Sequence, residues 1–323
     1  MLAQMGAKVT KIESLKRMDY MRNEGPKVDG ASVLFHQLNH NKTCLIFDYE
    51  SPQGIDKVFE LIKNADILVE QFRPGAMDAW GFSYNELQQI NPKLIYVSLT
   101  GYSQNSNYKN EAGHDLNFMA YSGVLSLIKD ELGKPVVSGT QFSDIAGAYL
   151  AIIAVQSALI KRNKTGVGEY LNVSLANAMN PFLTIPFALH KSGMPHQQVN
   201  LLNGNTVANY SVYRCADNKW IALAAFEMKF WNLFCEIVEK EEWQSTSVLN
   251  LANAQFDKEK IKMLFETKER DEWIKFFKNK DVCIAPVLEI EELEESEYHI
   301  SNKSFKTFTT ENGEELLGIS LRF

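Results

Sequence analysis

Three short segments of the chain combine glycine or other small residues, a titratable side chain and the start of an apolar helical pattern, a combination suited to proton or acyl chemistry. The first is Glu111–Phe118, in which Gly113 frees the backbone and His114 stands at or beside a helix N-terminus. Unpaired backbone N–H groups at such an end can hold an anion or an oxyanion. The sequence leaves a second interpretation open, in which Asp115 caps the helix and His114 only faces solvent.

The second segment, Gly139–Gly147, places Asp144 at a helix start. An aspartate in this position is commonly an N-cap that accepts a backbone N–H, and this interpretation also stays open. The small residues at 146–148 favour a functional role, because they let another segment or a ligand approach the backbone closely.

The third segment, Ala224–Trp231, carries Glu227 between an apolar strand pattern and an apolar helix pattern. Its carboxylate is compatible with an N-cap, with a first-turn group favoured by the helix dipole, or with a catalytic group. The remaining histidines fit neither a catalytic triad nor a metal site: His36, His40, His190, His196 and His299. The sequence contains no GxGxxG, P-loop or GxSxG motif, so dinucleotide, nucleoside-triphosphate and serine-hydrolase functions have no support.

The composition is that of a globular protein whose 323 residues predict two domains. A formal net charge of −7 argues against a general nucleic-acid binder but not against an anionic ligand held by a few cations. The four cysteines form no CxxC pair and no zinc spacing, which predicts reduced thiols and no metal.

The location expected from the sequence is the cytoplasm, without membrane association. No apolar run reaches the ~18 residues needed to cross a bilayer. The N-terminal residues also lack the apolar core of a signal peptide.

The elements that must position these groups alternate between strand and helix over the first half of the chain. Strand patterns cover residues 7–13, 43–48, 67–72, 94–99 and 168–174, after a short helix tail at residues 2–5. Helical patterns begin at Pro52, cover 115–128 and 143–161, and the last ends at a Lys/Arg-rich stretch followed by Gly166. This alternation predicts a parallel sheet with crossover helices, hence an α/β fold.

The pattern changes after about residue 190. A hairpin is expected from 210–213 and 220–224, helices from 229–239 and 269–279, and a solvated helix face from the acidic run 289–297. We therefore expect a boundary between a large and a small domain near residues 185–205.

Read together, the segments resemble one family, the family III CoA-transferases, which include α-methylacyl-CoA racemases. The resemblance rests on motifs in family order over nearly the whole chain: Met5–Glu13, Asn39–Thr43, Phe47–Asp48, Ala65–Gly75 (ADILVEQFRPG), Gly113–Phe118 (GHDLNF), Ser143–Asp144, Lys164–Glu169 and Ala285–Val287. The GHDxN[FY] pattern is similar to that of the racemase branch.

The resemblance implies a Rossmann-like large domain with a parallel sheet and a smaller α+β domain, in two subunits that interlock as a homodimer. The large, CoA-binding domain would span 1–185 and be joined by the C-terminal segment 300–323, and the small domain would span 205–299. Family members begin with a further strand, so the strand at 7–13 is expected to lie beside an unfilled position of the sheet.

The resemblance also implies the site. His114 and Asp144 would carry the two protons of a racemisation, and Glu227 would support the histidine across the dimer. The CoA thioester, which is the substrate, would need no further cofactor. Its contacts are expected at these residues: Phe47, Asp48, Tyr49, Glu50, Phe72, Arg73, Gly113, Asp115, Leu116, Asn117 and Phe118.

The activity implied is racemisation of 2-methylacyl-CoA thioesters, with two alternatives. In a CoA-transferase, Asp144 would instead be the acyl-accepting nucleophile, and a third interpretation is a CoA-binding protein without catalysis. The chain also departs from the family just after Glu13, where Ser14-Leu15 replaces the usual arginine. Lys16 or Arg17 would then supply the phosphate contact.

Overall fold

The computed structural model describes residues 1–130, 132–194, 207–244 and 258–321, and the chain forms two compact units. The first unit comprises Met1–Ala112, Asp144–Ala178 and Glu291–Phe323, and the second comprises Gly113–Ser143 and Met179–Ile290. The expected large domain, 1–185, includes residues 113–143, whereas these residues group with the second unit by their contacts. Part of the expected boundary, residues 195–206, lies outside the described residues.

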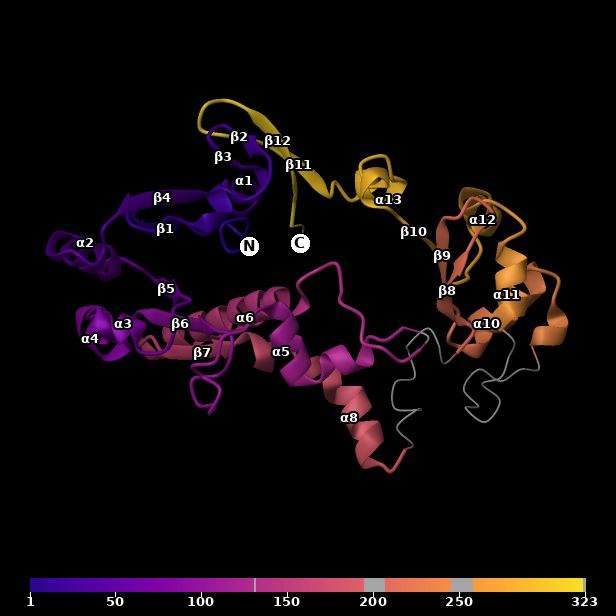
Figure 1. The fold of residues 1–323 in the computed structure, drawn as a ribbon, viewed down its shortest axis with the longest axis horizontal. Helices are drawn as coiled ribbons and strands as arrows, with labels where there is room; N and C mark the ends of the chain where they lie inside the picture. The colour runs from indigo at the N-terminus through magenta and orange to yellow at the C-terminus, as the bar shows by residue number, and fades with distance from the viewer. Residues whose placement is uncertain (131, 195–206, 245–257, 322–323) are drawn as a thin grey trace. The chain divides into compact units, whose positions relative to one another are not determined.

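Parallel strands form the framework of the first unit (Figure 1). β1 (Val9–Ser14) pairs with β4 (Lys42–Phe47). β5 (Ile67–Glu70), β6 (Ile95–Thr100) and β7 (Tyr170–Ser174) form a second parallel sheet in that order. The α/β class predicted from the alternation of strand and helix patterns is confirmed.

Helices cover both faces of the sheet β5–β6–β7. Tyr96 of β6 packs in a core cluster with side chains of α2 (Pro52–Lys63) and α4 (Tyr84–Ile90). Its neighbour Val97 packs instead against α6 (Phe142–Thr165). Since successive side chains of a strand point to opposite faces, the two helical layers lie on opposite sides of this sheet.

The ends of these helices follow local signals. At the start of α2 the Ser51 hydroxyl accepts the N–H of Gly54 at 3.1 Å, and Pro52 occupies the first turn, where its missing N–H is not needed. α6 ends just before Gly166, whose φ of 77° lies in the left-handed region that ends helices. The predicted stop of α6 is therefore confirmed.

Smaller elements complete the first unit. Among them, α1 is joined to the C-terminal hairpin β11–β12 by the Gln37 side chain, which donates to the Leu317 carbonyl at 2.6 Å. The bounds are η1 (Tyr20–Arg22), β2 (Lys27–Val28), β3 (Ala31–Ser32), α1 (Val33–Asn39), α3 (Ala76–Ala79), α7 (Leu175–Ala178), α13 (Glu297–Ser301), β11 (Phe305–Thr309) and β12 (Glu315–Ile319).

The second unit is built around an antiparallel sheet, β10–β9–β8, with a core rich in aromatic side chains. Trp231 and Phe234 are fully buried there, with ring centroids 5.5 Å apart. Its elements are α5 (Asp115–Ser122), η2 (Val124–Leu127), η3 (Asn180–Leu183), α8 (Thr184–Lys191), β8 (Tyr210–Arg214), β9 (Trp220–Ala224), α10 (Met228–Ile237), η4 (Glu241–Trp243), α11 (Lys258–Phe265), α12 (Arg270–Phe277) and β10 (Ile284–Val287).

Three predicted elements differ from the observed ones. The helix expected over 115–128 ends at Ser122, because Gly123 adopts a φ of 89° and a 3-10 turn follows. The acidic run 289–297 is not one helix but a 3-10 turn, η6 (Ile290–Glu292), and the start of α13. Residues 2–5 form hydrogen-bonded turns rather than a helix tail.

α6 is a 24-residue helix and, in the described ranges, the one helix long and apolar enough to cross a membrane by length and composition. Only 28% of its most apolar window is buried. Its exposed apolar side chains follow helical spacing and form one stripe: Ile145, Tyr149, Ile153 and Ile160. The sequence predicts no segment long and apolar enough to cross a membrane, and α6 differs from that prediction by its length and composition.

β1 has an open edge, since β4 is its one partner among the described strands. Ile12 of β1 and Leu68 of β5 nevertheless pack against the same core cluster. Unpaired N–H and C=O groups on such an edge favour pairing with other chains. We therefore expect the isolated protein to be poorly soluble. We also expect an added N-terminal strand of apolar, β-branched residues to increase its solubility.

The measurement is the soluble fraction and melting temperature of the chain with and without that strand. An extension of equal length made of Gly and Ser is the control, and it is expected to change neither value. A soluble unextended chain that melts above ~60 °C, the upper end for mesophile domains, would show that the open edge is harmless.

Candidate active site

The segment that leaves β4 supplies the first group of predicted contacts. Phe47 is the last residue of β4, and Asp48 accepts hydrogen bonds from the backbone N–H of Glu50 at 3.1 Å and the Nζ of Lys16 at 3.0 Å. Lys16 Nζ also lies 3.6 Å from the Glu50 carboxylate. The hydrogen bond from Lys16 lowers the pKa of Asp48, and the same bond raises the pKa of Lys16.

A close approach between backbones holds this segment on the start of α2. A Cβ atom at Gly54 would lie 1.8 Å from the carbonyl oxygen of Asp48. Only glycine leaves room for that contact. The position of residues 48–50 is therefore fixed by the first turn of a helix that the sequence predicts.

An aromatic cluster, Tyr49–Phe72–Trp80, joins the segments that follow β4 and β5. The ring centroids of Phe72 and Trp80 are 4.9 Å apart and those of Tyr49 and Trp80 are 5.4 Å apart, both edge to face. This arrangement is favourable for aromatic pairs. It brings two predicted contacts, Tyr49 and Phe72, into one cluster, together with Trp80, which the sequence analysis does not single out.

Two arginines in this region are exposed and have no ion-pair partner among the described residues, Arg17 and Arg73. Burial raises the pKa of Tyr49, and the positive charge of Arg17 opposes that shift, so the guanidinium lies near the aromatic cluster. Since Lys16 is held by Asp48 and Glu50, Arg17 is the better of the two expected phosphate contacts. A guanidinium also suits phosphate geometry.

His114 lies at the N-cap position of α5 in the second unit, and it is exposed. Its backbone N–H donates to the side-chain oxygen of Asn117 at 3.1 Å, and its carbonyl accepts the N–H of Asn117 at 2.8 Å. Asn117 therefore stabilises the N-terminus of α5. The N-cap residue is thus His114 and not Asp115.

Asp115 makes the contact that connects two of the predicted segments. Its Oδ1 accepts hydrogen bonds from both the N–H and the hydroxyl of Ser143, each at 2.7 Å. Ser143 is fully buried. His114 precedes Asp115 and Asp144 follows Ser143 in the chain, so each candidate proton carrier is the covalent neighbour of one partner in this contact.

The other predicted residues differ in exposure. Asp144 lies in the first turn of α6 and is exposed rather than occupying a cap position. Phe118 is 4% exposed, whereas Leu116 on the same helix is 42% exposed. Gly113 directly precedes the N-cap of α5.

Glu227 occupies the N-cap position of α10, but its side chain makes no cap hydrogen bond. The carboxylate is 63% exposed and its Oε1 lies 3.8 Å from Lys229 Nζ. An exposed pair of this kind contributes little to stability. The carboxylate is thus available for contacts outside the unit that carries it.

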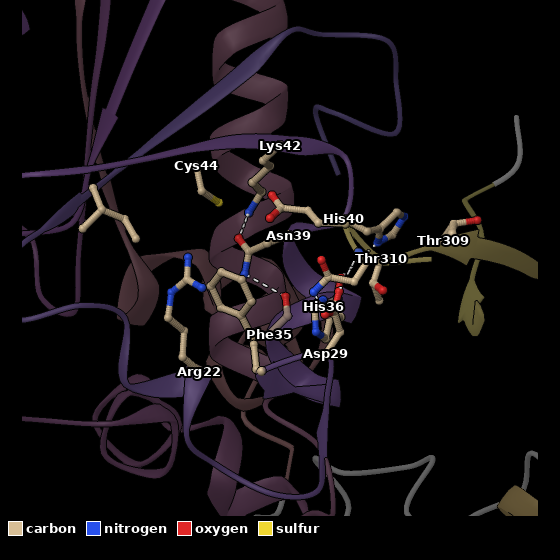
Figure 2. A pocket seen from close by; sticks show the side chains of 15 residues that line it. Arg22, Asp29, Phe35, His36, Asn39, His40, Lys42, Cys44, Thr309 and Thr310 are labelled. Atoms are coloured by element: carbon tan, nitrogen blue, oxygen red, sulfur yellow. Dashed lines mark hydrogen bonds between the residues drawn. The ribbon is translucent and has the colours of Figure 1, made fainter. Parts of the chain in front are cut away.

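A separate cavity of about 350 Å³ lies in the first unit and contains none of the predicted site residues (Figure 2). Lys42 and Asn39 point toward one another across it, with Nζ and Oδ1 2.9 Å apart. Two histidines set aside in the sequence analysis, His36 and His40, also line it. No group of three or more His, Cys, Asp or Glu side chains suited to a metal ion occurs in the described part of the chain.

Comparison with known proteins places these features in a family. The sequence model of CoA-transferase family III matches residues 1–322. The chain belongs to CoA-transferase family III. It is 29% identical to the alpha-methylacyl-CoA racemase of Homo sapiens over 98% of this chain and 78% of the relative. It is 28% identical to the human succinyl-CoA:glutarate CoA-transferase over 88% of this chain and 66% of that relative.

The fold agrees with this membership. The crystal structure of a CAIB/BAIF family protein from Brucella suis matches with a TM-score of 0.82, at 24% identity, over 100% of this chain and 86% of that chain. The family and the α/β fold implied by the sequence motifs are therefore confirmed. The roles of His114, Asp144 and Glu227 stay predictions.

Two residues beside the predicted contacts are not among those predicted from the sequence. Trp80 completes the aromatic cluster, and Glu70, inside the ADILVEQFRPG motif, has a buried carboxyl group at the end of β5. The signal for Glu70 is visible in the sequence, since it is an acidic residue in a short apolar strand. Trp80 carries no such local signal.

Proposed function

We propose that this member of family III racemises 2-methylacyl-CoA thioesters by removing the α-proton from one face and delivering a proton to the other face of the resulting enolate. The observation that carries the proposal is the Asp115–Ser143 contact, which joins the segments of His114 and Asp144. Racemisation needs one proton carrier on each face of the α-carbon. His114 and Asp144 would supply them, as two titratable groups of different type.

The mechanism assigns each residue one task. An imidazole exchanges protons near neutral pH, because its unperturbed pKa is about 6.5, and His114 fills this role. Asp144 carries the proton on the opposite face. For this task the bound acyl chain must make its surroundings apolar, because a carboxyl group stays partly protonated near neutral pH only in such surroundings. Backbone N–H groups at the start of α5, beside Gly113, would stabilise the enolate oxygen.

The CoA part would be held by the first unit. Arg17 and Arg73 would pair with phosphate groups, and the Tyr49–Phe72–Trp80 cluster would pack against the nucleotide. Phe47, Asp48 and Glu50 would line the same region. We propose no cofactor beyond CoA itself, and a cytoplasmic location.

A CoA-transferase is the second candidate, since both activities occur among the relatives. Asp144 would then attack the thioester carbonyl, release CoA thiolate and form an acyl anhydride. CoA thiolate would then attack the aspartyl carbonyl of the anhydride, which gives an aspartyl thioester and releases the first acid as a carboxylate. The second carboxylate would attack this thioester to form a new anhydride and release CoA thiolate, which attacks the new acyl carbonyl, yields the product acyl-CoA and frees the Asp144 carboxylate. A catalytically inactive CoA-binding protein is the third candidate.

Incubation with 2-methylacyl-CoA in D₂O separates these candidates. A racemase incorporates deuterium at the α-carbon and inverts it, without change in the acid bound to CoA. A transferase leaves that carbon unlabelled and gives a covalent aspartyl adduct in the intact mass. Binding of CoA with neither reaction would indicate the third candidate.

We further propose that the protein is a homodimer, in which Glu227 reaches the partner's site. The apolar stripe on α6 and the exposed Ile185 and Phe187 on α8 are surfaces that a dimer would cover. An interlocked dimer is expected to bury over ~2,000 Å².

Light scattering is expected to give twice the chain mass, and Ile153→Glu on the exposed stripe of α6 is expected to lower it. Lys164→Glu, on the same helix but polar in the wild type, is the matched control. A folded, active monomer in the wild type would contradict the dimer.

A further inference from the structure

The buried carboxyl group of Glu70 lies at the end of β5, two residues before the aromatic cluster. Glu70 is 8% exposed, and its Oε2 accepts the backbone N–H of Phe72 at 2.8 Å. A side-chain acceptor that bonds the N–H two residues ahead closes a turn. The bond therefore sets the direction in which the chain leaves the sheet.

A buried polar residue of the neighbouring strand lies beside this carboxyl group. Glu70 lies opposite Ser98 in the parallel register, and Ser98 is fully buried. The Ser98 hydroxyl accepts the Nε2 of Gln104 at 2.7 Å, and its proximity to the carboxyl group lowers the pKa of Glu70. The loop after β6 therefore holds Ser98 in place beside the carboxyl group, whose own hydrogen bond is with the Phe72 N–H.

Placing a carboxyl group here is electrostatically costly. Burial raises the pKa of Glu70 and the nearby Asp78 adds to the shift, while Ser98 and the hydrogen bond from the Phe72 N–H oppose it. The strand is otherwise apolar, from Ile67 to Val69. A buried acidic group in such a strand needs its hydrogen bonds, and the bond to Phe72 is the one that reaches out of the sheet.

The turn that Glu70 closes leads into groups suited to an anionic ligand. Phe72 packs on Trp80 within the aromatic cluster, and the exposed Arg73 follows it. The Arg73 carbonyl accepts the N–H of Ala76 at 3.0 Å, and Gly75 has a φ of 87°. The loop is therefore tied at both ends, by Glu70 before it and by α3 after it.

We infer that Glu70 is a positioning residue for acyl-CoA: it fixes the Phe72 backbone, and through it holds Arg73 and the aromatic cluster in the arrangement that receives the phosphate and nucleotide groups. Glu70 itself does not touch the ligand. The inference rests on the proposed use of CoA. The glutamate of the ADILVEQFRPG motif would thus shape the protein's own loop and take no part in the chemistry.

The test compares two variants of the full chain. Glu70→Leu removes the acceptor at similar size, and Glu70→Gln keeps an amide oxygen that can accept the Phe72 N–H. Loss of one charged hydrogen bond predicts CoA binding about tenfold weaker or more for the leucine variant, and within about threefold of wild type for the glutamine variant. Calorimetric titration with CoA gives the affinity. Glu86→Gln, in the exposed capping box of α4, is the control.

Hydrogen exchange of the Phe72 amide without CoA is the second measurement. It is expected to accelerate in Glu70→Leu and to stay slow in Glu70→Gln. If the leucine variant does not fold, Glu70→Asp replaces it in both measurements. Its shorter side chain places the carboxylate oxygen too far from the Phe72 N–H, so weaker CoA binding and faster exchange are again expected.

The outcomes distinguish the positioning role of Glu70 from the proposed function. Wild-type protein that does not bind CoA overturns the proposed function, whatever the exchange data show. Wild-type binding that Glu70→Leu leaves unchanged, or that Glu70→Gln loses equally, overturns the positioning role and leaves the proposed function intact.

Discussion

His114→Ala and Asp144→Ala are each expected to abolish racemisation, with a loss of at least roughly 10²–10⁴-fold, the range that general acid–base groups supply. Inversion needs a proton carrier on both faces of the α-carbon, so neither residue can replace the other. Each single variant is still expected to exchange the α-proton of one enantiomer, because the remaining base works from its own face.

The assay follows α-deuterium uptake and acyl-CoA exchange side by side in the wild type and both variants. His190→Ala, an exposed histidine on α8 outside the site, is the matched control and is expected to keep full activity. The protein would be a transferase if His114→Ala kept full activity, Asp144→Ala had none, and CoA moved between carboxylic acids. The nucleophile alone carries that reaction.

Glu13→Gln is expected to lower the free energy of unfolding of the first unit at pH 7 by about 3–5 kcal/mol, as for other buried ion pairs that lose one partner. The Glu13 carboxylate is 2% exposed and accepts the Nε and Nη2 of Arg22 at 2.9 and 2.8 Å. It also accepts the backbone N–H of Asp19 at 3.0 Å. These bonds hold the 15–22 segment, which carries Lys16 and Arg17.

The same residue predicts a dependence of stability on pH. Burial raises the pKa of Glu13, but the hydrogen bonds from Arg22 and Asp19 outweigh it and lower the pKa from 4.5 to about 2. A group whose pKa is lower in the folded than in the unfolded state stabilises the fold at pH values above its unfolded-state pKa. That contribution is lost as the pH falls toward the folded-state pKa. The stabilisation by Glu13 is therefore complete above pH 4.5 and disappears toward pH 2.

Urea unfolding of the wild type and Glu13→Gln at pH 7 and pH 3 measures this effect. The difference between the two proteins is expected to shrink at pH 3. Glu60→Gln, whose carboxylate is 67% exposed in a pair with Lys63, is the control. It is expected to change the free energy of unfolding by less than about 0.5 kcal/mol. Equal stability of Glu13→Gln and wild type at pH 7 would refute the role of the buried pair.

Local patterns in the sequence determined the elements and the family. Ser51-Pro52 sets the start of α2, and the glycine after the basic residues sets the end of α6. Alternating strand and helix patterns required a parallel sheet, and motif order identified CoA-transferase family III. These features were readable because caps, periodicity and motifs depend on residues a few positions apart.

The tertiary structure decided which side chains meet. Asp115 bonds Ser143, 28 positions away, and Lys16 is taken by Asp48 and Glu50, which leaves Arg17 free among the described residues for a phosphate. It also placed residues 113–143 with the second unit. Contacts of this kind follow from strand register and from how helices pack on a sheet. Those depend on the whole core at once, so no local pattern in the sequence encodes them.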